Sequence, residues 1–228
     1  RGWSMVWRED ITRRPWRAPA RAVQSRIPEP EVLVRRVRYA VAASLDGYVA
    51  GPKGEADWIV IDPDIDFRAL TSEFDTVLVG GRTWEGMTAG GPAGKVFGMR
   101  TYVFSRTIDP AAYPEVTVVA DHAPEIVAAL REESGRDIWL YGGGLLFRSL
   151  LEAGVVDTVE VAVIPVLLGE GIPLYPSPGM RAKLRLTRHK LYPRTGTLGL
   201  EYAIAPPARH SRRSAPAGAF AVRSRAAH

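Results

Sequence analysis

The 228-residue chain contains no cysteine, which excludes disulfide bonds, thiolate metal ligands and a cysteine nucleophile. It has no apolar run near the roughly 20 residues that a membrane-spanning helix needs, since the longest, residues 161–168, is interrupted by Pro165. The four histidines are scattered and predict no metal site. A chain without cysteine is typical of a reducing compartment, so we expect a cytoplasmic protein without a membrane partner.

Three familiar phosphate-binding or catalytic motifs are also absent. The segment nearest to a P-loop, residues 89–96, has Ala89 in place of the first glycine and Val96 in place of the magnesium-binding hydroxyl. A dinucleotide fingerprint beginning at Gly142 would need a third glycine where the chain has Phe147. No Gly-x-Ser-x-Gly elbow occurs. Any nucleotide site must therefore be built in another way.

Basic charge is concentrated at the two ends of the chain. Residues 1–36 hold nine arginines against four acidic side chains, and residues 206–228 hold five arginines and no acid. Residues 37–205 hold 16 basic and 21 acidic side chains, a net charge of −5. A nucleic-acid-binding domain is expected to be basic within its own fold. We therefore expect nucleic acid, if it binds at all, to bind only through the ends.

The composition predicts one folded domain, residues 35–205, between two disordered extensions, residues 1–34 and 206–228. The apolar fraction of 46% and the charged fraction of 24% are ordinary for a globular protein. Residues 1–34 are rich in Arg, Pro and Trp and have no apolar segment of the secretory type. An organellar targeting peptide is the alternative interpretation of that segment. The last 23 residues are rich in Ala, Pro, Arg and Ser.

Short apolar strands alternate with helical segments inside the predicted domain. Strands are predicted at residues 37–43, 76–79, 101–104, 116–119, 138–141 and 156–164, with an antiparallel pair at 184–191 and 198–204. Helices are predicted at 66–74, with Asp64 near the N-cap, and at 82–87, 124–133 and 144–153. This order predicts a three-layer α/β fold with a mainly parallel central sheet and an antiparallel C-terminal edge.

Three segments follow predicted strands directly: Gly80–Thr83, Ser105–Thr107 and Gly142–Gly144. In sheets of this kind ligands bind beyond the C-terminal ends of the strands. Glycine allows close approach to bare backbone, and the free N–H groups at a helix start attract phosphate. The three segments together predict a nucleotide diphosphate site. For any one of them, a tight connection that binds nothing is the alternative.

Five segments in one order carry a family resemblance that covers about residues 37–205. They are residues 42–47, 80–85, 105–106, 141–144 and 165–171. They resemble the dihydrofolate reductase-like fold, and most closely the C-terminal reductase domain of the bifunctional riboflavin-biosynthesis deaminase–reductase and its stand-alone relatives. The resemblance implies an NADPH-dependent oxidoreductase with a small pyrimidine- or pterin-like substrate, such as a ribosylaminouracil phosphate. It also implies a homodimer. Because no deaminase zinc motif precedes the domain, we expect a stand-alone reductase.

The resemblance also implies cofactor-binding positions in this chain. The nicotinamide is expected against the first strand and the loop after it, the pyrophosphate against Thr83 and the glycine triplet, and the 2′-phosphate at Arg106, with Arg82 as a second candidate. Because Gly81 stands where the family often has arginine, NAD remains an alternative to NADP. The full set is Ala42, Ala43, Val49, Gly81, Arg82, Thr83, Ser105, Arg106, Tyr141, Gly142, Gly143, Gly144, Leu145 and Leu146.

Two carboxylates are candidate proton donors. Asp64 lies 19 residues before Thr83, the spacing at which dihydrofolate reductases place a carboxylate, and clustered acids can raise one another's pKa. Asp46 is the second candidate. Helix capping and turn formation explain both residues without chemistry. Phe147 stands where folate reductases commonly have tyrosine, which argues against folate. Dihydrofolate reductase activity and NADPH binding without turnover remain the alternatives.

Overall fold

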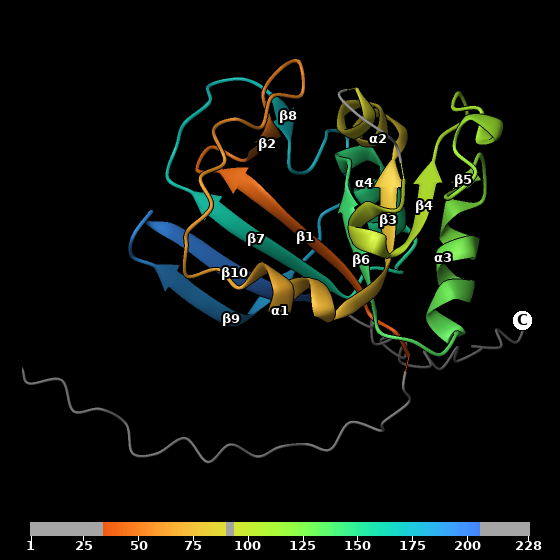
Figure 1. Ribbon diagram of the computed structural model, residues 1–228. Helices are drawn as coiled ribbons and strands as arrows, with labels where there is room; N and C mark the ends of the chain where they lie inside the picture. The colour runs from red at the N-terminus through yellow and green to blue at the C-terminus, as the bar shows by residue number, and fades with distance from the viewer. Residues whose placement is uncertain (1–33, 90–93, 206–228) are drawn as a thin grey trace, which may run out of the picture. The chain divides into compact units, whose positions relative to one another are not determined.

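The computed structural model describes residues 34–89 and 94–205 (Figure 1). The two predicted extensions therefore lie outside the described residues, apart from Val34. Within the described part, eight strands form one sheet in the order β5-β4-β3-β6-β1-β7-β10-β9. These strands are β1 (Val37–Ser44), β3 (Phe74–Gly80), β4 (Arg100–Phe104), β5 (Thr117–Val119), β6 (Asp137–Gly142), β7 (Thr158–Ile164), β9 (Leu184–Tyr192) and β10 (Thr197–Ile204).

The six strands from β5 to β7 are parallel to their neighbours, and β10 pairs antiparallel with both β7 and β9. The predicted fold class, a mainly parallel sheet with an antiparallel C-terminal edge, is confirmed. A separate ribbon joins β2 (Tyr48–Ala50) to β8 (Ile172–Pro173). The sequence analysis missed this ribbon because strands of three and two residues are too short to show alternation.

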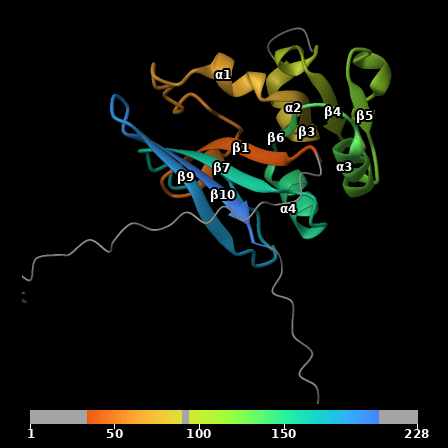
Figure 2. The ribbon, with the colours of Figure 1, turned by 90° about the horizontal axis from the view of Figure 1, so that it is seen from below.

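Helices cover both faces of the sheet. They are α1 (Phe67–Ser72), α2 (Gly81–Thr88), α3 (Ala123–Glu132) and α4 (Gly144–Glu152), with the 3₁₀ turns η1 (Val96–Gly98) and η2 (Pro110–Ala112). Figure 2 shows α1 and α2 on one side of the sheet and α4 on the other. In the part of the chain that the structure describes, no helix is long and apolar enough to cross a membrane.

Strand alternation divides the buried side chains between the two faces. Tyr39 of β1 and Leu140 of β6 pack with α3 and α4, and the Tyr39 ring stacks on Phe147 at a centroid distance of 3.8 Å. On the other face Trp139 packs in a second core that includes Trp84 of α2. Because successive side chains of a strand point to opposite faces, Arg38, Ala40 and Ala42 of β1 lie on the α1–α2 side.

The start and the end of the first helix differ from the prediction. The N-cap of α1 is Asp66, whose side chain accepts the Ala69 N–H at 2.8 Å, and Asp64 lies two residues before it without capping the helix. The helix ends at Ser72, and Phe74 is fully buried as the first residue of β3. Burying a side chain of this size contributes about 1.5–3 kcal/mol, which favours the sheet over one more helical turn.

Candidate active site

The glycine turns after β3 and β6 touch each other. A side-chain carbon added at Gly80 would lie 3.2 Å from the Gly143 nitrogen, and one added at Gly143 would lie 3.0 Å from Thr83 Oγ1. In Figure 1 these two strands end side by side, where α2 and α4 begin. The prediction that Thr83 and the glycine triplet share one place is confirmed. Glycine is needed there because a larger residue would push the two turns apart.

The loop after β4 reaches the same group of turns. A side-chain carbon at Gly81 would lie 2.9 Å from Ser105 Oγ. Ser105 Oγ in turn accepts the N–H groups of Thr107 and Ile108 at 3.2 and 3.3 Å, which fixes the loop. The space that an arginine at position 81 would need is therefore occupied by Ser105.

Two helix N-termini open toward the same glycines. Helix α2 has Gly80 as its N-cap and α4 has Gly143, and among the described residues neither helix start is capped by a side chain. The peptide bond between Gly142 and Gly143 is cis. Uncapped N–H groups and the helix dipole favour an anion at each start. Two such starts in contact can hold both halves of a diphosphate.

A cavity of about 1670 Å³ extends from these turns across the α1–α2 face of the sheet. Ala42, Ala162 and Gly199 stand in register on β1, β7 and β10, and give this part of the cavity a floor with little side chain. Ligand pockets usually measure about 300–1,000 Å³. The cavity is therefore large enough for a dinucleotide and a second small molecule together.

A family model described as the RibD C-terminal domain matches residues 35–196. This chain belongs to the RibD C-terminal domain family. The uncharacterized protein YyaP of Bacillus subtilis (strain 168), one relative, is 31% identical over 169 residues, which cover 69% of this chain and 89% of YyaP. The resemblance predicted from the motifs is confirmed.

Two solved structures show the same fold. A putative riboflavin biosynthesis protein from Shewanella sp. PV-4 superposes with a TM-score of 0.64 at 21% identity, covering 75% of this chain and 99% of that one. Dihydrofolate reductase from Enterococcus faecalis, complexed with NADP(H) and RAB-propyl, superposes with a TM-score of 0.56 at 19% identity, covering 75% and 97%. The fold of this chain is thus dihydrofolate reductase-like.

Most of the residues predicted to bind the cofactor line the cavity, but three do not. Ala43 is 2% exposed and belongs to the core on the α3–α4 face. Ser105 lies beside Gly81, and neither Ser105 nor Arg106, the residue after it, is part of the cavity lining. The lining residues of the predicted set are Ala42, Val49, Gly81, Arg82, Thr83, Tyr141, Gly142, Gly143, Gly144, Leu145 and Leu146.

The side chain of Asp46 holds two loops together and does not line the cavity. Its carboxylate accepts hydrogen bonds from Ser44 Oγ at 2.6 Å and from the N–H groups of Leu168 and Gly169 at 3.1 and 2.8 Å. The bonds from Ser44 and Gly169 hold the pKa of Asp46 below its ordinary value. The family segment 165–171 is thereby fastened to the turn after β1. This geometry explains Asp46 without a catalytic role.

The three aspartates at positions 62, 64 and 66 do not lie together around one site. Asp66 caps α1, as described above. The Asp64 side chain is 55% exposed, lies 3.8 Å from Arg194 and is not part of the cavity lining. Asp62 is fully buried and accepts the Thr195 N–H and hydroxyl at 3.0 and 2.9 Å. Burial alone would raise the pKa of Asp62, but bonds from Asp64 N–H and Thr195 lower it overall. The geometry therefore gives no support to a catalytic role for Asp64.

An aromatic wall, which we define as Phe97, Trp139 and Tyr141, closes one side of the cavity. Phe97 lies parallel to Trp139 at 5.4 Å, and Trp139 donates its indole N–H to the Ala40 carbonyl at 2.9 Å. The alternation of residues 139 and 141 along β6 could have indicated that they share one face. Phe97, in contrast, comes from η1, and no pattern in the sequence places it there.

A buried arginine, Arg38, joins two glutamates that line the cavity with it. Arg38 donates to both carboxylate oxygens of Glu160, at 2.6 and 2.8 Å, and also pairs with Glu73. Burial alone would lower the pKa of Arg38, but the bonds to these two glutamates raise it overall. The sequence analysis missed this group because its members come from β1, β7 and the end of α1.

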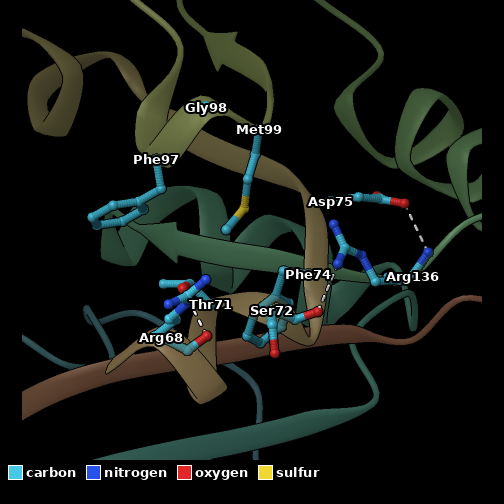
Figure 3. Close-up of a pocket in the computed structure, with 9 residues that line it drawn as sticks. All are labelled: Arg68, Thr71, Ser72, Phe74, Asp75, Phe97, Gly98, Met99 and Arg136. Atoms are coloured by element: carbon cyan, nitrogen blue, oxygen red, sulfur yellow. Dashed lines mark hydrogen bonds between the residues drawn. The ribbon is translucent and has the colours of Figure 1, made fainter. Parts of the chain in front are cut away.

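A smaller cavity of about 350 Å³ lies between α1 and η1 (Figure 3). Arg68 and Arg136 line it, and Arg136 donates to the Ser72 carbonyl at 2.9 Å. Phe97 lines both cavities, so the two are neighbours.

Proposed function

We propose that this chain is an NADPH-dependent reductase that acts on a small pyrimidine- or pterin-like substrate of the riboflavin-biosynthesis type. The observation that carries the proposal is the contact between Thr83 and Gly143, which brings two uncapped helix starts to one point. Bare N–H groups at such a point suit a pyrophosphate. Membership of the RibD C-terminal domain family supports reductase chemistry. The cofactor would supply the hydride, while the protein binds and orients both reactants.

The remaining cofactor contacts follow from the floor and the rim of the cavity. Ala42 and Val49 line the cavity near the turn after β1, where a flat nicotinamide ring would fit. Arg82 lines the cavity at the start of α2, and Arg106 directly follows Ser105, which lies beside Gly81, so both guanidinium groups are candidates for the 2′-phosphate. A guanidinium fork matches phosphate oxygens in shape and charge.

The space beside the nicotinamide position suits a planar substrate. Its floor is the stripe formed by Ala42, Ala162 and Gly199, and its side is the aromatic wall. Flat heterocycles pack favourably on such surfaces. Phe147 is buried against Tyr39 and does not line the cavity, so the absence of a tyrosine hydroxyl there does not discriminate between folate and other substrates.

Equilibrium titration with NADPH, followed by fluorescence, tests the proposed site. Gly143→Val is expected to weaken binding at least about 100-fold, equal to about 2.8 kcal/mol, because the new side chain would press on Thr83 Oγ1. The control Ala129→Val adds a comparable bulk to the exposed face of α3 and should bind as the wild type does. Equal NADPH affinity in all three proteins would contradict the site.

A second candidate function is NADPH binding without turnover. It is favoured by the position of Asp46 and Asp64, since neither carboxylate lines the cavity. A panel of dihydropterins and ribosylaminopyrimidines, with and without a 5′-phosphate, separates the two functions. Oxidation of NADPH by any member supports the reductase, whereas saturable NADPH binding with no oxidation across the panel favours the second function.

We also propose that two copies of the chain pair through the β9 edge of the sheet. In β9, eight of the nine residues are exposed, and Leu184, Leu186 and Leu191 are 44%, 47% and 61% exposed. A long open edge with apolar side chains is a template for strand pairing. A second copy would supply the missing neighbour.

A further inference from the structure

We infer that Tyr141 is the catalytic residue that donates the proton to the substrate, an inference that rests on the proposed reduction. Tyr141 directly precedes Gly142, the first residue of the glycine triplet, and it lines the cavity. On β1, Tyr39 pairs with Leu140, and Tyr141 is the next residue of β6. Tyr141 packs against Trp139, on the face of the sheet that holds the cavity. Tyr141 therefore stands between the diphosphate turns and the floor on which a substrate would rest.

The acidic groups nearest to this place are already engaged. Glu160 stands on β7, in register with Ala40 of β1, but both of its oxygens accept from Arg38. Glu73 pairs with the same guanidinium. Carboxylate oxygens that accept from a guanidinium are committed to a strong charge-assisted hydrogen bond. These two residues therefore shape the floor and do not act as acids.

Three further carboxylates line the cavity: Asp66, Glu201 and Glu85, the last of which lies on α2. Asp66 caps α1 through the Ala69 N–H. Glu201 stands on β10, one strand beyond Glu160. Neighbouring strands lie about 4.8 Å apart, so Glu201 is about two strand spacings from β1, whereas Tyr141 is one spacing away. Tyr141 therefore stands on the strand next to β1 and directly before the glycine triplet, a place that none of these carboxylates shares.

The Tyr141 ring is held in place while its hydroxyl remains available. Trp139 packs against the ring edge-on at 5.3 Å, and Phe97 covers it at 6.1 Å. Within the residues that the structure describes, the hydroxyl makes no hydrogen bond that would commit it to another group. Burial raises the pKa of Tyr141 above its ordinary value, so the phenol keeps its proton at neutral pH. A fixed ring with an uncommitted O–H is suited to donation.

The reaction that this position allows is balanced. NADPH, when bound, supplies hydride to the carbon of a C=N or C=O bond in the substrate. As that bond becomes single, its electron pair moves to the nitrogen or oxygen, which takes the proton from the Tyr141 O–H. The phenolate then recovers a proton from water, so that one NADPH and one proton are consumed for each substrate reduced.

The variant Tyr141→Phe keeps the ring and removes only the hydroxyl group, which carries the proton. We expect single-turnover oxidation of NADPH by the reactive dihydropterin or ribosylaminopyrimidine to slow by about 10²–10⁴-fold, while the Kd for NADPH changes less than about twofold. The control is Tyr113→Phe, because Tyr113 packs edge-on against Trp84 at 5.4 Å and does not line the cavity. An unchanged rate in Tyr141→Phe would overturn the inference.

A crystal structure with NADP⁺ provides a readout that does not depend on turnover. Hydride donor and acceptor approach to about 3–3.5 Å, and a proton donor lies about 2.6–3.2 Å from its acceptor atom. Tyr141 Oη is therefore expected within about 6 Å of nicotinamide C4. A hydroxyl beyond about 8 Å, or one bonded to a cofactor phosphate, would overturn the proton-donor role and leave the proposed reductase standing. Absence of NADPH binding would instead overturn both.

Discussion

At the residue scale, the candidate site depends on positions where a side chain is missing. Gly80, Gly81 and Gly143 each lie so close to a neighbouring turn that an added carbon would come within 3.2 Å of another atom. The glycine turns were predictable from the sequence because glycine after a strand has few other uses. Arg38 and its glutamates were not predictable, because their pairing depends on the register between distant strands.

Recognition of the 2′-phosphate can be assigned by comparing two arginines. Arg82→Ala or Arg106→Ala should raise the Kd for NADPH about 10- to 100-fold, the loss of a charged hydrogen bond of about 1.5–3 kcal/mol. The Kd for NADH should stay constant in both variants, because NADH has no 2′-phosphate. Arg194→Ala, on the β9–β10 turn, is the control. An unchanged ratio of NADPH to NADH affinity in both variants would show that neither arginine reads the phosphate.

At the element scale, two buried or bonded aspartates hold the loops around the cavity. Asp46 fastens the turn after β1 to Leu168 and Gly169, and Asp62 fastens the segment before α1 to Thr195 on the β9–β10 turn. The strands of the main sheet and the four α-helices were predictable from periodicity to within a few residues. The hydrogen bonds of Asp46 and Asp62 were not predictable, since the bonded residues lie more than 120 positions apart in the sequence.

The Asp46 tether predicts a dependence of stability on pH. Because its pKa is lower in the folded than in the unfolded chain, the ionised carboxylate stabilises the fold above its ordinary pKa of 3.8, and this contribution is lost as the pH falls further. Asp46→Asn should therefore lower the Tm by several degrees at pH 7, and by much less at pH 3. Calorimetry at both values measures the difference. The same decrease in Tm at both pH values would contradict the assignment.

At the scale of the whole molecule, one sheet presents two different faces. The α3–α4 face is filled by core side chains, while the α1–α2 face leaves the large cavity open beside the glycine turns. That most strands run parallel was predictable from the alternation of strands and helices. The cavity was not, because its volume depends on how short α1 is and where η1 lies.

The proposed pairing of two copies is tested by light scattering after size-exclusion chromatography. The wild-type chain of 25.0 kDa should elute as a dimer of about twice that mass. The double variant Leu186→Glu, Leu191→Glu should elute as a monomer, because charged side chains on an open edge oppose strand pairing. A wild-type protein that stays monomeric at micromolar concentration would contradict the pairing.

The most direct test of the central claim is where the cofactor diphosphate lies in a crystal structure of the chain with NADP⁺. The account predicts diphosphate oxygens within about 2.7–3.2 Å of N–H groups at the starts of α2 and α4, with Thr83 Oγ1 between them. A diphosphate bound elsewhere on the chain, with the Thr83–Gly143 junction in contact only with water, would contradict it.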